Sequence, residues 1–299
     1  MKYKATSALS LLATLEQIFP DTSKTSLRSW LKEGRVSLDN FPIKMGNIVV
    51  KPGQEIEVSS KPHVTKKGRI QIYYEDRYIV IVEKPVGLLT VSTAFETELT
   101  VHALLKEHYR TNSIYVVHRL DQHTSGVMLF ARTEAARDQL KDMFEKHDLE
   151  RTYIGIVEGV LDAEKEGTWS AYVYEDGNYV VHATTDPSRG ALAVTHYTIE
   201  RSDMRSTWLR MELETGRKNQ IRVHCQLAGH PIVGDRKYGA KTNPIKRLCL
   251  HAHSLAFKHP ITQKPMRFIS PIPQAFYRVM APVRSLKGVS KRSLDSKKT

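Results

Sequence analysis

The spacing of apolar residues divides the chain into a short helical start and a long series of strands. One helix is predicted from five apolar residues at helical spacing, Leu11, Leu12, Leu15, Ile18 and Phe19. A second helix is predicted over residues 26–33, ending at Gly34. Short strands over 36–38, 48–50 and 55–58 follow, separated by turns. Residues 1 to about 60 are therefore predicted to form one small unit of helices and strands.

A second unit is predicted after a polar, basic segment at residues 61–69. A strand, a turn at 75–77 and another strand are expected within residues 72–83. Thr133 is placed to cap a helix that runs to about His147. Apolar residues mark the buried face of this helix: Ala136, Leu140, Met143 and Phe144. Strands are then predicted to dominate as far as about residue 230.

A short polar segment around Asp121 separates two apolar runs, residues 114–117 and 127–131, which both read as buried strands. Thr124, Ser125 and Gly126 are turn-forming residues. A carboxylate on a loop framed by rigid strands is well placed for chemistry. From spacing alone, however, the favoured interpretation is a surface turn in which Asp121 caps backbone N–H groups, because Asp is common in turns.

The composition of the chain limits its size, its number of domains and the classes of binding partner that it favours. The 299 residues allow one large and one small domain, and 40% hydrophobic residues suffice for a sizeable core. The 45 Lys and Arg against 32 Asp and Glu give a net charge of +13, which favours nucleic acid or an anionic membrane surface as partner. No run approaches eighteen apolar residues, so no membrane span is expected.

Two features of the sequence indicate the cellular compartment in which the protein is expected. The apolar run from Ala8 to Ala13 has no clear cleavage site and reads as a helix rather than a signal peptide. With only Cys225 and Cys249, a disulfide framework is not expected, and a reducing cytosol fits. A cytoplasmic location is therefore predicted.

The segment from His118 to Gly126 resembles the HRLDxxTSG signature of the RluA-type pseudouridine synthases. The stretch from Lys84 to Val91 likewise resembles the KPxGLxV stretch of that family. The resemblance implies that Asp121 is the catalytic aspartate. It also implies an α+β fold with a mixed, mainly antiparallel central sheet and flanking helices, whereas periodicity alone shows only many short strands.

Two further segments extend the resemblance, which runs from about residue 84 to 260. The predicted strand that begins at Glu150 carries Tyr153, which matches the active-site tyrosine of the family. Residues 215–239 resemble GRxHQIRxHxxxxGxPIxGDxxYG, and Arg222 matches the arginine that pairs with the catalytic aspartate. A guanidinium binds a carboxylate through two parallel hydrogen bonds and should keep Asp121 ionised. Asn219 stands where the family usually has His, which is expected to alter local RNA or loop contacts without abolishing activity.

The implied reaction is the isomerisation of uridine to pseudouridine in RNA, which needs no cofactor. The base must leave the RNA stack, and Arg119 is the candidate for holding the space it vacates, with His118 and Thr124 as further RNA or base contacts. An extended segment would place Arg119 and Asp121 on one face. Although three residues alternate on one predicted strand (Cys249, His251 and His253), no closed ligand set accompanies them, so no metal is predicted.

The first unit resembles the small alpha-L RNA-binding domain, the S-four type of ribosomal proteins. The resemblance implies phosphate contacts by four basic residues, Lys24, Arg28, Lys32 and Arg35, although a solvated basic face would look the same. The predicted domains are residues 1–62 for RNA binding and 63–283 for catalysis, with a basic tail at 284–299. The tail either adds nonspecific RNA affinity or only aids solubility.

Three alternatives stay open. Large-subunit ribosomal RNA is the favoured substrate, since the appended first domain is typical of family members that act on it, and transfer RNA is the second candidate. A non-catalytic ribosome-associated RNA-binding protein would need no acid at Asp121. A base-excising glycosylase would use a similar acid and release free uracil.

Overall fold

The computed structural model describes residues 1–38, 41–43, 46–50, 52–59, 70–92, 100–161 and 164–280. The chain divides into two compact units, residues 1–69 and 70–299, seven residues beyond the predicted boundary after residue 62. The predicted basic segment at 61–69 and the predicted tail at 284–299 lie outside the described residues. Each unit has its own apolar core.

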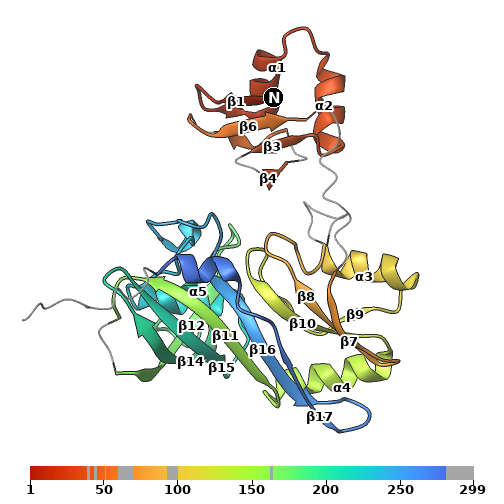
Figure 1. The fold of residues 1–299 in the computed structure, drawn as a ribbon, viewed down its shortest axis with the longest axis vertical. Helices are drawn as coiled ribbons and strands as arrows, with labels where there is room; N and C mark the ends of the chain where they lie inside the picture. Colours follow the sequence, from red (N-terminus) through yellow and green to blue (C-terminus); the bar gives the residue numbers. More distant parts are fainter. Residues whose placement is uncertain are drawn as a thin grey trace, which may run out of the picture. The chain divides into compact units, whose positions relative to one another are not determined.

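The first unit packs two helices against a small sheet (Figure 1). Ser10 and Ser23 cap the two helices by accepting hydrogen bonds from backbone N–H groups of the first turn. Leu11, Leu15 and Leu27 of these helices are buried in the core of the unit. The elements are β1 (Lys2–Lys4), β2 (Leu9–Ser10), α1 (Leu11–Ile18), α2 (Lys24–Lys32), β3 (Val36–Leu38), β4 (Phe41–Pro42), β5 (Val49–Val50) and β6 (Glu55–Val58), with sheet orders β1-β6-β3-β4 and β2-β5.

The second unit is built on one large sheet with the order β13-β12-β14-β15-β11-β16-β10-β8-β7. β9 pairs with β10, and β17 pairs with β16. All pairs are antiparallel except β10 with β16, so the sheet is mixed but mainly antiparallel. The strands are β7 (Ile72–Glu75), β8 (Ile79–Lys84), β9 (Tyr115–Val116), β10 (Ser125–Ala131), β11 (Glu150–Glu158), β12 (Glu166–Glu175), β13 (Val181–Thr184), β14 (Ala191–Ser202), β15 (Ser206–Leu213), β16 (Leu250–Lys258) and β17 (Pro265–Ile269).

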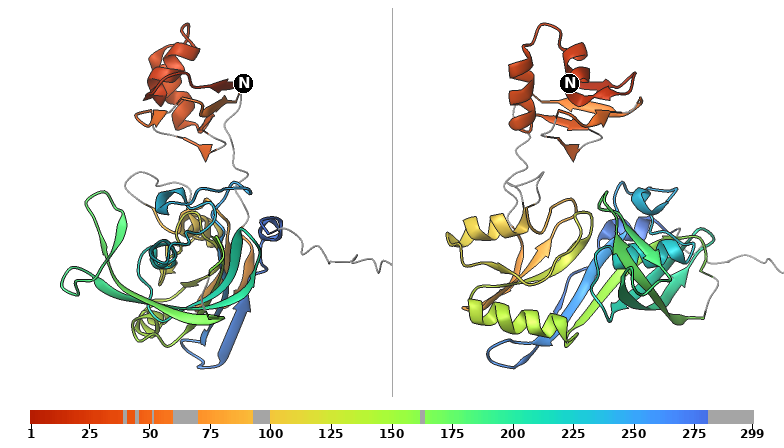
Figure 2. Two further views of the ribbon diagram at one scale, coloured as in Figure 1. Left: turned by 90° about the vertical axis from the view of Figure 1, so that its left-hand side faces the viewer. Right: turned by 180° about the vertical axis from the view of Figure 1, so that it is seen from behind.

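In the described part of the second unit, three α-helices and two short 3-10 helices flank this sheet. They are α3 (Val101–Tyr109), α4 (Glu134–Glu145), α5 (Gln220–Leu227), η1 (Arg236–Tyr238) and η2 (Gln274–Arg278). α5 packs on β12, β13 and β14 within the curve of the sheet, whereas α4 packs on β9 and β10 from the other face of the sheet (Figure 2). Among the described residues, no helix is long and apolar enough to cross a membrane.

Glycine is required where the parallel strands β10 and β16 meet. Gly126 has a φ of +124°, and a Cβ atom there would lie 2.1 Å from the carbonyl oxygen of Ala252. No side chain fits that space, and few adopt that backbone conformation. Gly126 thus allows β10, which follows the Asp121 segment, to pair directly with β16.

The predicted fold class is confirmed, and one predicted element is wrong. Thr133 caps α4 as predicted, and its hydroxyl accepts a hydrogen bond from the backbone N–H of Ala136. Residues 220–227, however, form a helix rather than part of the strand series. The β-branched residues Ile221 and Val223 favour a strand locally, but packing against β12–β14 overrides this weak preference.

Three histidines of the second unit are held in neutral form, His224 and His251 buried and His118 partly buried. Burial lowers the pKa of His118 to about 3 and those of His224 and His251 to about 4. His118 also accepts a hydrogen bond on Nε2 from the backbone N–H of Leu129, 3.0 Å away, which requires that nitrogen to be unprotonated. An unfolded histidine titrates near 6.5. The unfolded chain therefore binds more protons than the folded chain below that pH.

We expect the free energy of unfolding to fall as the pH drops from about 6.5 towards 4. Each of these neutral histidines contributes a slope of roughly 1.4 kcal/mol per pH unit in that window. Above the window the slope is zero and the full stability is retained. Denaturant titrations at pH 7 and pH 5 measure the difference. His118→Gln should reduce the slope, and the exposed His147→Gln should not. An unchanged slope in His118→Gln would contradict the neutral state assigned to His118 in the folded protein.

Candidate active site

Asp121 lies in the loop that leads into β10, and the backbone of this loop is held at several points. The hydroxyl of Thr90 donates to the carbonyl oxygen of Leu120 at 2.8 Å and accepts from its N–H at 3.2 Å. The backbone N–H of Thr124 donates to the carbonyl oxygen of Asp121 at 3.1 Å, closing a turn. The side chain of Asp121 keeps 28% of its surface exposed. A fixed backbone thus presents a carboxylate that a substrate can reach.

Lys84, the last residue of β8, supports the same loop from inside the protein. Its side chain is fully buried, and Nζ donates to the carbonyl oxygens of Gln122 at 3.0 Å, Thr124 at 2.6 Å and Pro85 at 3.1 Å. Burial lowers the pKa of Lys84 to about 7, and the carboxylate of Asp121 opposes this shift. The lysine therefore ties β8 to both sides of the turn that carries Asp121.

Arg222 projects from α5, but its two parallel hydrogen bonds do not go to Asp121 as predicted. Nε and NH2 donate to the two carboxylate oxygens of Asp235, at 2.7 and 2.8 Å. Only NH1 faces Asp121, with 3.4 Å to Oδ2. The pairing with Asp121 is therefore a single contact, because the buried Asp235 takes the Nε side of the guanidinium and Asn219 shares NH1. Arg222 and Asp121 still form an ion pair across 101 positions of sequence.

Tyr153 lies on β11, at an irregularity in its pairing with β16 between Thr152 and Tyr153. It is buried, with 8% of its surface exposed. Burial raises the pKa of Tyr153 to about 12, Arg151 opposes the rise, and Asp121 adds to it. The phenol is therefore protonated at neutral pH and lies within electrostatic reach of Asp121.

The other predicted base contacts differ in exposure: one is exposed, one is partly buried and one is buried. Arg119 is exposed, Leu120 is buried, and Asp121 is partly exposed, in keeping with the predicted alternation. His118 instead turns inward, where its ring stacks on Phe144 of α4 with centroids 4.8 Å apart. Thr124 is 2% exposed. The contacts of His118 and Thr124 favour a role in holding the loop over a direct contact with RNA.

The four basic residues predicted to bind RNA lie in the first unit and differ in their surroundings. Arg28 and Lys32 are exposed on α2. Lys24 is also exposed but pairs with Glu16, with 3.0 Å between Nζ and Oε1. The guanidinium of Arg35 lies 4.6 Å from the ring centre of Trp30, and its Nε donates to the carbonyl oxygen of Ser59. Arg28 and Lys32 are thus the more accessible pair.

Comparison with known proteins gives this geometry a chemical identity. A family model described as RNA pseudouridylate synthase matches residues 78–227, half of the chain, including Asp121, Tyr153 and Arg222. The chain belongs to the RNA pseudouridylate synthase family. It is therefore an isomerase of RNA uridine, and the resemblance to the RluA type is confirmed.

Relatives of this synthase match along most of its length. An uncharacterised RNA pseudouridine synthase of Bacillus subtilis is 34% identical over 84% of this chain and 86% of the relative. A protein named ribosomal large subunit pseudouridine synthase D, from Xanthomonas campestris pv. campestris, is 32% identical over 91% of this chain and 88% of the relative. The solved structure of human RNA pseudouridylate synthase domain containing 4 shares the fold, with a TM-score of 0.56 and 22% identity over 69% of this chain and 90% of that one.

Sequence reasoning missed two side chains of the synthase that surround Arg222. Asp235 holds its guanidinium, and Tyr238 lies under it with 4.8 Å from the guanidinium carbon to the ring centre. Both stand at fixed letters of the GDxxYG part of the matched motif, so the motif itself was the available signal. Asn219, whose difference from the usual His was expected to alter local RNA or loop contacts, is buried and binds Arg222 and Tyr238.

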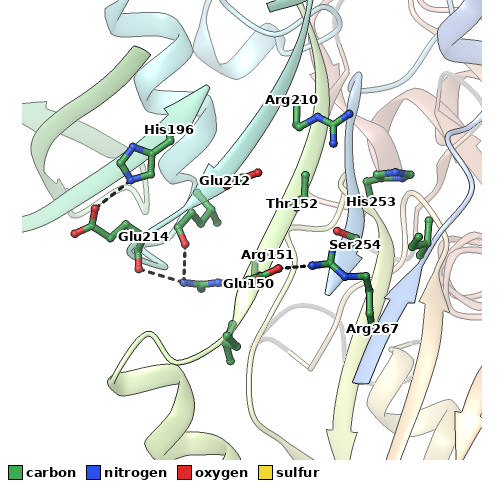
Figure 3. Close-up of a pocket in the computed structure, with 13 residues that line it drawn as sticks. Glu150, Arg151, Thr152, His196, Arg210, Glu212, Glu214, His253, Ser254 and Arg267 are labelled. Atoms are coloured by element: carbon green, nitrogen blue, oxygen red, sulfur yellow. Dashed lines mark hydrogen bonds and ion pairs between the residues drawn. The ribbon is translucent and has the colours of Figure 1, made fainter. Parts of the chain in front are cut away.

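A separate hollow of about 400 Å³ lies along β11, β15 and β16, and Asp121, Tyr153 and Arg222 do not line it. Charged side chains in it pair with one another: His196 binds Glu214, and Arg267 binds Glu150 (Figure 3). The Asp121 site is therefore the better candidate for the reaction. Within the described part of the chain, no group of three or more His, Cys, Asp or Glu is arranged to hold a metal ion.

Proposed function

We propose that this synthase isomerises uridine in large-subunit ribosomal RNA, with Asp121 as the carboxylate that acts on the ribose. One observation carries the proposal for the site: Asp121 is a reachable carboxylate on a fixed loop, facing a buried arginine. The proposal for the substrate is supported by relatives named ribosomal large subunit pseudouridine synthase D, which match about nine tenths of this chain.

The chemistry assigns a separate task to each side chain. The bond between N1 of uracil and C1′ of ribose breaks, the base turns, a bond forms between C5 and C1′, and the proton of C5 moves to solvent as N1 gains one. Asp121 acts on the sugar as a nucleophile or as a general base. NH1 of Arg222 orients its carboxylate.

The remaining two residues handle the base. Tyr153 is protonated and offers a phenol ring on which a flipped base can stack. Arg119 is exposed two residues before Asp121, so its side chain is free to enter the RNA and hold the space that the base leaves. Both assignments need Asp121 to lie between the RNA backbone and the rotated base.

Pseudouridine mapping in total RNA from cells with and without the gene tests the proposal. We expect at least one position in large-subunit ribosomal RNA to lose its pseudouridine and to regain it when the wild-type gene is returned. The gene with Asp121→Asn should not restore it. Loss confined to transfer RNA would overturn the substrate, and release of free uracil would overturn the reaction.

The first unit is proposed to bind RNA. Deleting residues 1–62 should weaken binding to structured RNA by about tenfold or more, because phosphate contacts supply much of such affinity. The single-turnover rate at saturating RNA should change by less than about threefold, since every proposed catalytic residue lies in the second unit. Filter binding and single-turnover assays measure the two quantities. Unchanged affinity would contradict an RNA-binding first unit.

A point-variant pair separates a specific basic face from general charge. Arg28→Ala with Lys32→Ala removes the two accessible cations of α2. Lys141→Ala with Lys146→Ala removes the same charge from the exposed face of α4. Only the first pair should weaken RNA binding and reduce its dependence on salt, because only that face is proposed to meet phosphates. Equal losses from both pairs would show a nonspecific charge effect.

A further inference from the structure

Asn219 lies directly between the arginine of the proposed site and a buried tyrosine. Its Oδ1 accepts a hydrogen bond from NH1 of Arg222 at 3.0 Å, and its Nδ2 donates to the hydroxyl of Tyr238 at 3.0 Å. Only 8% of Asn219 is exposed. Its φ of +54° lies in the left-handed region, which asparagine tolerates better than most residues. Asn219 therefore bridges two groups from a position just before α5.

The direction of the amide follows from the chemistry of its neighbour. A guanidinium only donates hydrogen bonds, so the atom of Asn219 that faces Arg222 must be the oxygen. The NH2 group of the amide then faces Tyr238, whose hydroxyl accepts the bond. A carboxylate would accept hydrogen bonds from both neighbours, and it would place a negative charge beside Arg222.

The shared nitrogen connects Asn219 to Asp121. Asp235 binds Nε and one hydrogen of NH2 of Arg222, so NH1 keeps both of its hydrogens for other partners. One of its two hydrogens meets Oδ1 of Asn219, and the other points towards Oδ2 of Asp121. Asn219 thereby fixes the rotation of the NH1 end without adding a negative charge. An acidic side chain here would compete with Asp121 for the same nitrogen.

We infer that Asn219 is a positioning residue, which holds NH1 of Arg222 towards Asp121 as a neutral acceptor. The inference rests on the proposed role of Asp121. It explains why an amide serves at this position, where a hydrogen bond is needed and a charge is harmful. The charged and titratable groups that interact with Asp121 come from several elements: Arg222, Tyr238, Lys84, Tyr153 and His123. Asp235 binds Arg222 from the opposite side.

Two variants of the full chain test the inference. Asn219→Gly keeps the left-handed backbone accessible and removes the side chain. It should lower kcat by between about 10- and 100-fold, because the NH1 contact loses its support, and should leave KM within about twofold. His147→Gly is the matched control, since His147 also has a positive φ, 57°, and is exposed just after the C-terminal end of α4. The control should keep full activity.

Asn219→Asp keeps the shape and adds a carboxylate beside Arg222. The acidic limb of the pH–rate profile should move upward by about one pH unit, because a neighbouring negative charge disfavours ionised Asp121. A purely structural role would lower the melting temperature and leave the limb in place. If Asn219→Gly fails to fold, Asn219→Asp therefore still distinguishes a positioning role of Asn219 from a purely structural one.

The assay follows tritium release from RNA that carries tritiated uridine at C5, prepared from cells that lack the gene. Wild type and Asp121→Asn are run beside the Asn219 variants. An active Asp121→Asn would overturn the proposed site. An inactive Asp121→Asn combined with a normal kcat in Asn219→Gly, or with an unmoved acidic limb in Asn219→Asp, would overturn only the inference about Asn219.

Discussion

Replacing Asp121 with asparagine should reduce pseudouridine formation on the order of 10⁴-fold while RNA affinity stays within about twofold of the wild type. The substitution keeps the size of the side chain but removes the charge needed to attack the ribose or to accept a proton. The amide oxygen remains a partner for NH1 of Arg222, so the surrounding contacts survive. The loss should therefore appear in the chemical step.

Single-turnover tritium release and filter binding, measured on one preparation, separate the two effects. Asp142→Asn is the matched control, because Asp142 is an acid on α4 that pairs with Lys146 at the surface. The control should change neither quantity. Robust pseudouridine formation by Asp121→Asn would remove the assigned role of this residue and leave the family membership standing.

Replacing Arg222 with methionine should damage both catalysis and folding. Activity should fall by between about 10²- and 10³-fold, since Asp121 loses the group that orients it. Stability should fall by about 3–5 kcal/mol, because the buried carboxylate of Asp235 is left without its partner. Activity assays and denaturant titrations at pH 7 give the two values.

A double variant separates the two consequences. Arg222→Met combined with Asp235→Asn removes the uncompensated buried charge together with the arginine. This variant should recover most of the lost stability, because no buried charge remains unpaired, and it should stay inactive because nothing orients Asp121. Recovery of activity in the double variant would show that Arg222 acts only through the fold.

Local sequence patterns were sufficient for some elements of the second unit. The helix capped by Thr133 and the strand that contains Tyr153 follow from residues close together in the chain. The helix that carries Arg222 did not follow, because its β-branched residues favour a strand locally and only tertiary packing makes them helical. The motif nevertheless pointed to Arg222 without any knowledge of the element on which it lies.

The sequence by itself determined the family, and through that resemblance the mainly antiparallel α+β fold and the carboxylate on which the proposed reaction depends, because ordered motifs are properties of neighbouring residues. Tertiary structure alone decided how Arg222 is used. Its two-bond partner is Asp235, thirteen positions away, and its contact with Asp121 spans 101 positions. A buried guanidinium divides its few donors among whichever acceptors the fold brings within reach, and no local pattern encodes that division.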